Sequence, residues 1–191
     1  MRKAWIVGLI GICAACPGSQ KFLGDELMGT FSFTAEIASN DCPFAEVPDS
    51  GFAFQGTFSR DRDAGTAYLT VNGVSRGATF DGQYVTSEAT APRQFGACNC
   101  SSTILDETLK VALLSASQVA SLPNPGQCPA NPLDGGVPIP DGGILPPGST
   151  GRVFDALRAC GELTDVVVPL PDAGCSCATC RFVSRLQGIR Q

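Results

Sequence analysis

Apolar and polar residues alternate along the first half of the chain with the period of two that is typical of half-buried β-strands. From Gly29 to Ile37 the apolar residues occupy odd positions and the polar residues even positions. A second alternation runs from Phe52 to Phe58, and a third apolar segment runs from Ala67 to Val71. The sequence Asn72-Gly73 follows it, and this dipeptide favours a tight hairpin because both residues tolerate positive φ.

The strand pattern continues after this hairpin. Residues 76–80 and 83–87 are predicted strands, and Asp81-Gly82 provides the turn between them. Predicted strands thus recur about every ten residues with turn residues between them, a spacing that indicates an antiparallel meander.

The segment from Thr103 to Leu114 fits two structures. Leu105, Leu109, Val111 and Leu113 have the spacing of a strand that Glu107 interrupts, whereas some of the same leucines also have helical spacing. We favour a strand through Leu114. A short helix to Leu122 is expected next, because Ser115 and Gln118 have the spacing of a capping box.

The last third of the chain changes in composition. Residues 123–149 are rich in Pro and Gly and predict a long surface loop held by Cys128. Residues 153–160 have apolar residues at helical spacing with Gly161 just past the end, which predicts a helix. Short strands are expected at 165–168 and 181–186. The chain is therefore predicted to be mainly β, an antiparallel meander forming a small barrel or sandwich, with one or two short helices and a disulfide-stapled C-terminal third.

The N-terminus has the three parts of an export signal. Arg2 and Lys3 form a charged region, residues 4–15 form an apolar run, and the small residues Ala14 and Ala15 precede Cys16. This run is too short for a transmembrane helix, which needs roughly twenty residues.

The segment Cys13-Ala14-Ala15-Cys16 resembles the lipobox of bacterial lipoproteins, although Cys13 stands where that family usually has Leu. The resemblance covers residues 1–16 and implies cleavage before Cys16 and attachment of lipid to it. Pro17 stands where retention signals of the inner membrane usually have Asp, which by resemblance favours the outer membrane, facing the periplasm or the cell surface. The chain is therefore expected to comprise a signal peptide (1–15), a lipidated tether (16–28) and one domain (29–191).

Composition excludes several functions. The chain has no histidine, so mechanisms that need Ser-His-Asp or Cys-His and zinc sites that need imidazole are excluded. Loss of Arg2 and Lys3 leaves 11 basic and 18 acidic side chains, and this acidic balance is unlike that of a nucleic-acid-binding protein. No cofactor and no metal site are predicted.

Cysteine usage indicates an oxidising compartment. Ten cysteines are present, and eight remain after Cys13 is removed with the signal and Cys16 is lipidated. An even number in an exported chain predicts structural disulfides, whose connectivity the sequence does not give. The disulfide candidates are Cys42, Cys98, Cys100, Cys128, Cys160, Cys175, Cys177 and Cys180.

Three motifs resemble functional sites. Residues 73–77 match the G-x-S-x-G string, but Ser75 follows a predicted hairpin and no histidine is available to activate it. Asp61 and Asp63 resemble the opening of a calcium loop, whose later ligands are missing. Cys177-x-x-Cys180 has the spacing of a redox pair or of half a zinc site.

These observations favour a membrane-anchored envelope lipoprotein that binds a ligand or partner, or serves a structural role, without catalysis. The alternative is an enzyme, either a histidine-free hydrolase or a thiol oxidoreductase that uses Cys177 and Cys180. A small apolar ligand in a barrel and an envelope protein are the partners considered, besides the membrane. Six phenylalanines would line an apolar cavity or, as we favour, fill a solid core. They are Phe31, Phe33, Phe52, Phe54, Phe58 and Phe80.

Overall fold

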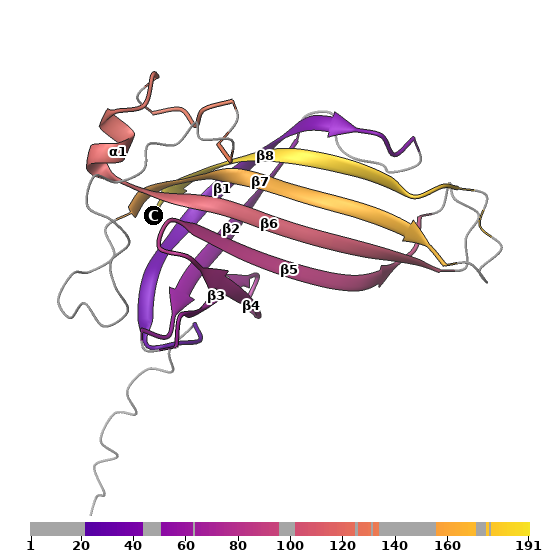
Figure 1. Ribbon diagram of the computed structural model, residues 1–191, viewed down its shortest axis with the longest axis horizontal. Coiled ribbons are helices and arrows are strands. Elements are labelled where there is room, and N and C mark those ends of the chain that lie inside the picture. The colour runs from indigo at the N-terminus through magenta and orange to yellow at the C-terminus, as the bar shows by residue number, and fades with distance from the viewer. Residues whose placement is uncertain are drawn as a thin grey trace, which may run out of the picture.

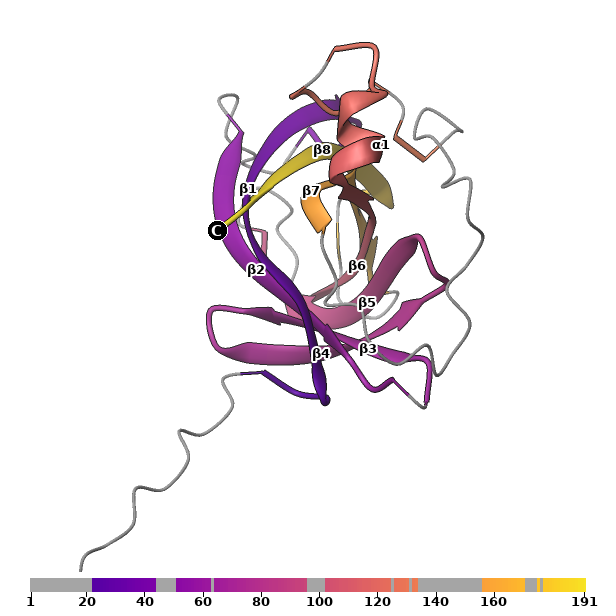
Figure 2. The same cartoon turned by 90° about the vertical axis from the view of Figure 1, so that its left-hand side faces the viewer.

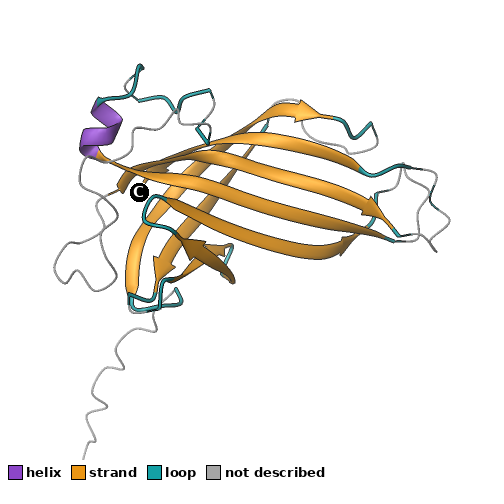
Figure 3. Cartoon of the chain, in the orientation of Figure 1, coloured by secondary structure: helices purple, strands orange, loops and turns teal. Residues whose placement is uncertain are grey.

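The computed structural model describes residues 22–43, 51–62, 64–95, 102–124, 126–130, 132–133, 156–170, 175 and 177–191. These residues form eight strands and one short helix, α1, which lies between β6 and β7 in the chain (Figure 3). The elements are β1 (Glu26–Asn40), β2 (Phe52–Arg60), β3 (Thr66–Val71), β4 (Val74–Phe80), β5 (Tyr84–Arg93), β6 (Thr103–Ser115), α1 (Ala116–Ala120), β7 (Ala156–Pro169) and β8 (Cys180–Arg190).

The strands form a closed antiparallel barrel in which each strand pairs with its neighbours in the chain and β8 pairs with β1. Figure 1 shows β5 to β8 running side by side as long strands, with the short β3–β4 hairpin below them. Figure 2, turned by 90°, shows the ring of strands from one end, with α1 beside the ends of β6 and β7. The mainly β fold with an antiparallel meander is confirmed, and the barrel is the form it takes.

Two predictions differ from the structure: the type of one element and the start of the first strand. Residues 156–160, expected as part of a helix, begin β7, and Gly161 lies inside this strand instead of ending a helix. Residues 153–155 of that expected helix, and residues 134–149 of the predicted loop, lie outside the described residues. Residues 26–28, expected as the end of the tether, form the start of β1, and Met28 is fully buried there.

Aromatic residues fill much of the barrel interior. Phe31, Phe33 and Phe58 are each at most 1% exposed, and their ring centroids lie 6.0–6.1 Å apart. Phe33 also stacks on Phe54 at 4.9 Å. Phe52, Phe54 and Phe80 are partly buried against the same cluster. The six phenylalanines therefore all belong to, or pack against, one core cluster inside the barrel.

Glycines make room for the ring of Phe33. Gly188 is its cross-strand partner on β8, and a Cβ placed there would lie 2.7 Å from the ring. A Cβ on Gly56 of β2 would lie 3.2 Å from the same ring. The ring of Phe33 thus fits here because the neighbouring positions on β2 and β8 are both glycines.

An ion pair joins the end of β2 to the start of β1. Arg60, at the end of β2, pairs with Glu26, at the start of β1, and both side chains are less than one-fifth exposed. The guanidinium of Arg60 also lies over the ring of Phe80 at 5.7 Å from its centroid. Arg60 thus contacts both a carboxylate and an aromatic ring that packs against the core cluster.

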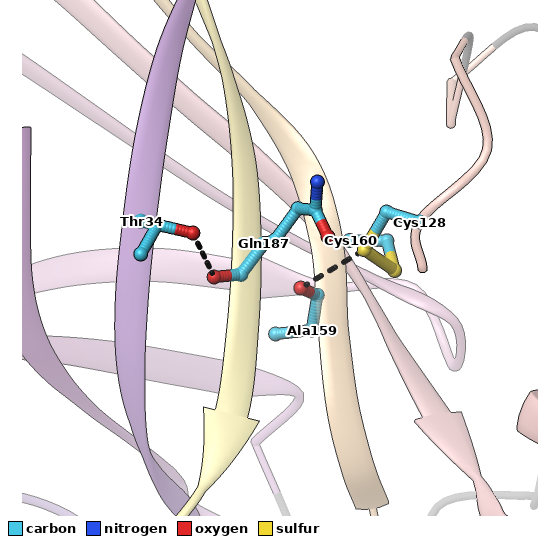
Figure 4. The surroundings of a disulfide bond; sticks show 5 residues. All are labelled: Thr34, Cys128, Ala159, Cys160 and Gln187. Atoms are coloured by element: carbon cyan, nitrogen blue, oxygen red, sulfur yellow. Dashed lines mark hydrogen bonds between the residues drawn. A yellow bond between two sulfur atoms is a disulfide. The ribbon is translucent and has the colours of Figure 1, made fainter. Parts of the chain in front are cut away.

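The segment after β6 packs on the outer wall of the barrel. Ser115 caps α1 in the predicted capping box with Gln118, and Leu122 beyond the helix packs with Ala112, Leu114 and Cys160. The disulfide Cys128–Cys160 fixes this segment to β7. Figure 4 shows the bridge against β7, with the sulfur of Cys128 3.7 Å from the carbonyl oxygen of Ala159.

A second disulfide joins the two strands that close the barrel. Cys42, just after β1, bonds to Cys180 at the start of β8, and these residues are 138 apart in the sequence. Cys175 and Cys177 are also disulfide-bonded. Cys98 and Cys100 lie outside the described residues. Disulfide stapling of the C-terminal part is therefore confirmed.

Candidate functional site

The β4–β5 pairing is the shortest in the barrel. Backbone pairing joins only Thr79 to Thr86 and Phe80 to Val85, at the end of β4 and the start of β5. One residue further along, the contact between β4 and β5 is made by a side chain and not by backbone pairing. Ser87 Oγ donates a hydrogen bond to the carbonyl oxygen of Gly77 at 3.1 Å. Figure 1 shows the β3–β4 hairpin turning away from β5 from there onward.

Beyond this point each strand is paired on one side only. Residues 74–78 of β4 pair with β3, and residues 87–93 of β5 pair with β6. We call the opening between these two segments the β4–β5 seam. A groove of about 240 Å³ lies at its start and is lined by Ala78, Thr79, Thr86 and Glu88.

Four polar side chains face the barrel interior beside this seam. Arg76 projects from β4 on the same side as the core residue Ala78, and Glu107 projects from β6 on the same side as Leu109. Asp165 of β7 is the cross-strand partner of Glu107, and Ser184 of β8 pairs with Leu163 next to it. We call Arg76, Glu107, Asp165 and Ser184 the polar row.

An ion pair spans the seam. Nη1 of Arg76 donates to Oε1 of Glu107, so the arginine reaches past β5 to the next strand. The side chains of Arg76 and Glu107 are 38% and 27% exposed, whereas Asp165 is 4% exposed and Ser184 is fully buried. Exposure thus falls from the seam towards β8.

Asp165 has a strongly shifted pKa. It is raised from 3.8 to about 7, mainly by burial and then by the negative charge of Glu107, while the positive charge of Arg76 lowers it. Cross-strand partners have Cβ atoms about 5 Å apart, so two carboxylates here repel each other. Asp165 therefore titrates near neutral pH, while the neighbouring Glu107 forms an ion pair with Arg76.

Two atoms of the polar row have no hydrogen-bond partner. They are Oδ1 of Asp165 and Oγ of Ser184, and both are buried. A buried polar atom without a partner costs free energy, on the order of 1–3 kcal/mol. Within the described residues, Ser59 Oγ and Gln83 Nε2 are also unpartnered, but Ser59 belongs to β2 and Gln83 to the turn before β5.

The polar row was not predicted from the sequence. One feature of the sequence did point to it: Glu107 interrupts the apolar alternation of β6. In the structure this position faces the interior and carries a charge. The neighbouring acids Asp106 and Glu107 face opposite sides of β6: Glu107 points inward, while Asp106 accepts a 2.7 Å hydrogen bond from Thr90. The approach of Arg76 and Asp165 to Glu107 depends on barrel closure, which spacing alone does not give.

The motif at 73–77 lies in the β3–β4 hairpin. Asn72 and Gly73 both have positive φ and form the predicted turn, and Ser75 shares a 2.8 Å hydrogen bond with Thr70 on the neighbouring strand. No helix follows Ser75, because β4 continues to Phe80. This serine therefore lacks the strand–turn–helix geometry of a hydrolase nucleophile.

Asp61 lies in the turn between β2 and β3. Its carboxylate accepts a 2.6 Å hydrogen bond from the hydroxyl of Tyr68, which raises the pKa of that tyrosine. Asp63 lies outside the described residues. Among the residues that the structure describes, no three Cys, Asp or Glu side chains gather as a metal site.

The cysteine spacing does not correspond to a redox pair. Cys180 bonds to Cys42 and not to Cys177, so the thiol oxidoreductase considered from the sequence lacks its dithiol. Cys177 is bonded to another partner. Both cysteines thus have structural bonds in this fold.

Comparison with known proteins does not assign the chain to a family. No family model, characterised protein or solved structure matches it. None of the helices in the described part of the chain is long and apolar enough to cross a membrane.

Proposed function

We propose that this protein is a lipid-anchored envelope protein whose barrel binds a small polar ligand without catalysing a reaction. The observation that carries the proposal is the polar row, where two buried oxygens lack hydrogen-bond partners beside an opening between strands. Ligand sites combine an apolar wall with a few convergent polar groups. The phenylalanine core and the polar row have this combination.

The absence of histidine and the arrangement of the cysteines both favour binding over catalysis. A hydrolase would need a base beside its nucleophile, and the chain has no histidine for this role. An apolar ligand, considered from the phenylalanines, is not favoured because those rings pack against one another.

The membrane anchor is part of the proposal and rests on the lipobox-like segment ending at Cys16. We propose the outer membrane as its location, with the barrel held close to the surface by a short tether. In the bacterial host, Cys16→Ala should abolish membrane fractionation of the mature form. A Cys16→Ala protein that still fractionates as the mature membrane form contradicts the anchor.

The binding proposal is tested by native mass spectrometry of the exported, lipid-free protein. The expected result is a bound small molecule that is lost on denaturation and is absent from the Asp165→Asn and Ser184→Ala variants. Glu162→Gln is the matched control, because Glu162 is on β7 but pairs across strands with Lys110 and Arg185 on the outer side. An adduct that all three variants keep would place the ligand elsewhere, and a protein without any adduct would favour a structural role.

A further inference from the structure

We infer that the polar row binds a small molecule with an ammonium group, whose nitrogen lies between Glu107 and Asp165 and donates a hydrogen bond to Ser184. This inference rests on the proposed function and specifies the chemical class of its ligand. It follows from the charges, the unpartnered oxygens and the opening of the seam.

The charges of the site favour a cation. Glu107 and Asp165 provide two carboxylates, and Arg76 provides one positive charge. The inner faces of the adjacent strands add no charge, because β5 presents Ser87 and Ala89 and β8 presents Phe182 and Ser184 there. One negative charge is therefore uncompensated when both acids are ionised, and an anionic ligand would meet two carboxylates.

The unpartnered atoms favour a ligand that donates hydrogen bonds. Oδ1 of Asp165 is an acceptor when the acid is ionised, and Oγ of Ser184 can also accept. Ser184 is the diagonal neighbour of Asp165 across the β7–β8 pairing, so the two side chains lie roughly 7–8 Å apart at their backbones. An ammonium group has several donors and can satisfy both oxygens from one position.

The seam gives this position a route to solvent. Arg76 and Glu107 are partly exposed at the opening, whereas Asp165 lies behind them and is 4% exposed. A small ligand that enters between β4 and β5 meets the ion pair first. Movement of the Arg76 side chain, which comes from a strand paired on one side only, would admit it.

Ligand and proton compete for the same carboxylate. With a pKa of about 7, Asp165 is mostly protonated at pH 6 and mostly ionised at pH 8. The ionised fraction changes about tenfold between these values, so ammonium binding should strengthen by about the same factor. Binding releases the proton of Asp165 at the lower pH.

The test uses methylammonium chloride as the probe and the lipid-free, oxidised protein, followed by amide NMR at constant ionic strength. Saturable shifts are expected at Asp165 and Ser184, with affinity about tenfold higher at pH 8 than at pH 6. Tetramethylammonium, a cation without N–H donors, should produce no saturable shift at these residues. Asp165→Asn should lose the response, and Glu162→Gln should keep it.

Several outcomes overturn the inference. Equal binding by Asp165→Asn, or tighter binding at pH 6, would show that the carboxylate is not the ligand group. A neutral or anionic molecule found in the polar row would leave the proposed function in place and refute only the ammonium class. Absence of both a native adduct and a methylammonium response, with correctly folded protein, would refute both proposals.

Discussion

Glu107 and Asp165 lie directly opposite each other on β6 and β7, and both side chains face the barrel interior. Arg76 pairs with Glu107 and leaves Asp165 as the more buried acid, with one oxygen unpartnered. Two facing carboxylates inside a barrel destabilise the fold when both are charged. Such an arrangement often marks a functional site, because stability alone does not favour it.

Asp165 should make the protein less stable as the pH rises. Its folded pKa of about 7 lies above the unfolded value of 3.8, so the folded state holds the proton more tightly. Its contribution to the free energy of unfolding should fall between about pH 4 and 7 and stay constant outside this window, with a total change of up to roughly 4 kcal/mol. Urea unfolding at several pH values measures this.

The Asp165→Asn variant isolates this effect, because Asn has nearly the same shape and does not titrate. It should be more stable than the parent at pH 8 and should lose the fall between pH 4 and 7. Glu162→Gln, on the outer side of the same strand, should keep the pH dependence of the parent. Parallel stability curves for parent and Asp165→Asn would refute the shifted titration.

Arg76→Gln should destabilise the barrel by about 1–3 kcal/mol, because it leaves the partly buried Glu107 without its partner. The double variant Arg76→Gln/Glu107→Gln should recover part of this loss. Arg62→Gln is the control, since Arg62 lies 3.9 Å from Asp25 in a half-exposed pair and should change stability by about 0.5 kcal/mol or less. Equal effects of Arg76→Gln and Arg62→Gln on the midpoint of urea unfolding would contradict a stabilising role for the partly buried Arg76–Glu107 pair.

Gly161→Ala should be one of the most damaging small substitutions in β7. A Cβ there would lie 2.0 Å from the carbonyl oxygen of Lys110. This oxygen belongs to the backbone of a paired strand, so moving it away would cost much free energy. A loss of roughly 3 kcal/mol or more is expected in thermal or urea unfolding. Gly77→Ala on β4 is the matched control, because nothing lies within 4 Å of its added Cβ. Similar stability of the two variants would show that β6 and β7 are not so closely packed.

The strands of the first half were predictable because each has one buried face. The alternation in 29–37 corresponds directly to the burial of Phe31, Phe33 and Ala35 in β1. The capping box of Ser115 and Gln118 was also predictable, because it depends only on local spacing. Local chemistry and a period of two were sufficient in these segments.

The start of β7 was not predictable from periodicity. Cys160 faces the outer wall but is fully buried beneath the segment after α1, while Ala159 faces the phenylalanine core. Burial on both faces removes the alternation that identifies a strand. Leu157 and Cys160 then had helical spacing by coincidence. The polar row was missed for a related reason, because its members come from four strands that only closure of the barrel brings together.

The Cys42–Cys180 bridge makes a prediction that distinguishes it from a Cys177–Cys180 pair. In the oxidised protein, Cys42→Ser should leave the thiol of Cys180 free, and a thiol reagent should detect this one thiol after denaturation. The double variant Cys42→Ser/Cys180→Ser should show no free thiol.

Loss of this bridge should also lower the free energy of unfolding by about 5 kcal/mol from loop entropy, because it spans 138 residues. Loss of Cys128–Cys160, which spans 32 residues, should cost about 4 kcal/mol on the same basis. An oxidised Cys42→Ser protein without a free thiol would mean that Cys180 has another partner, and the pairing that closes β1 on β8 would be wrong.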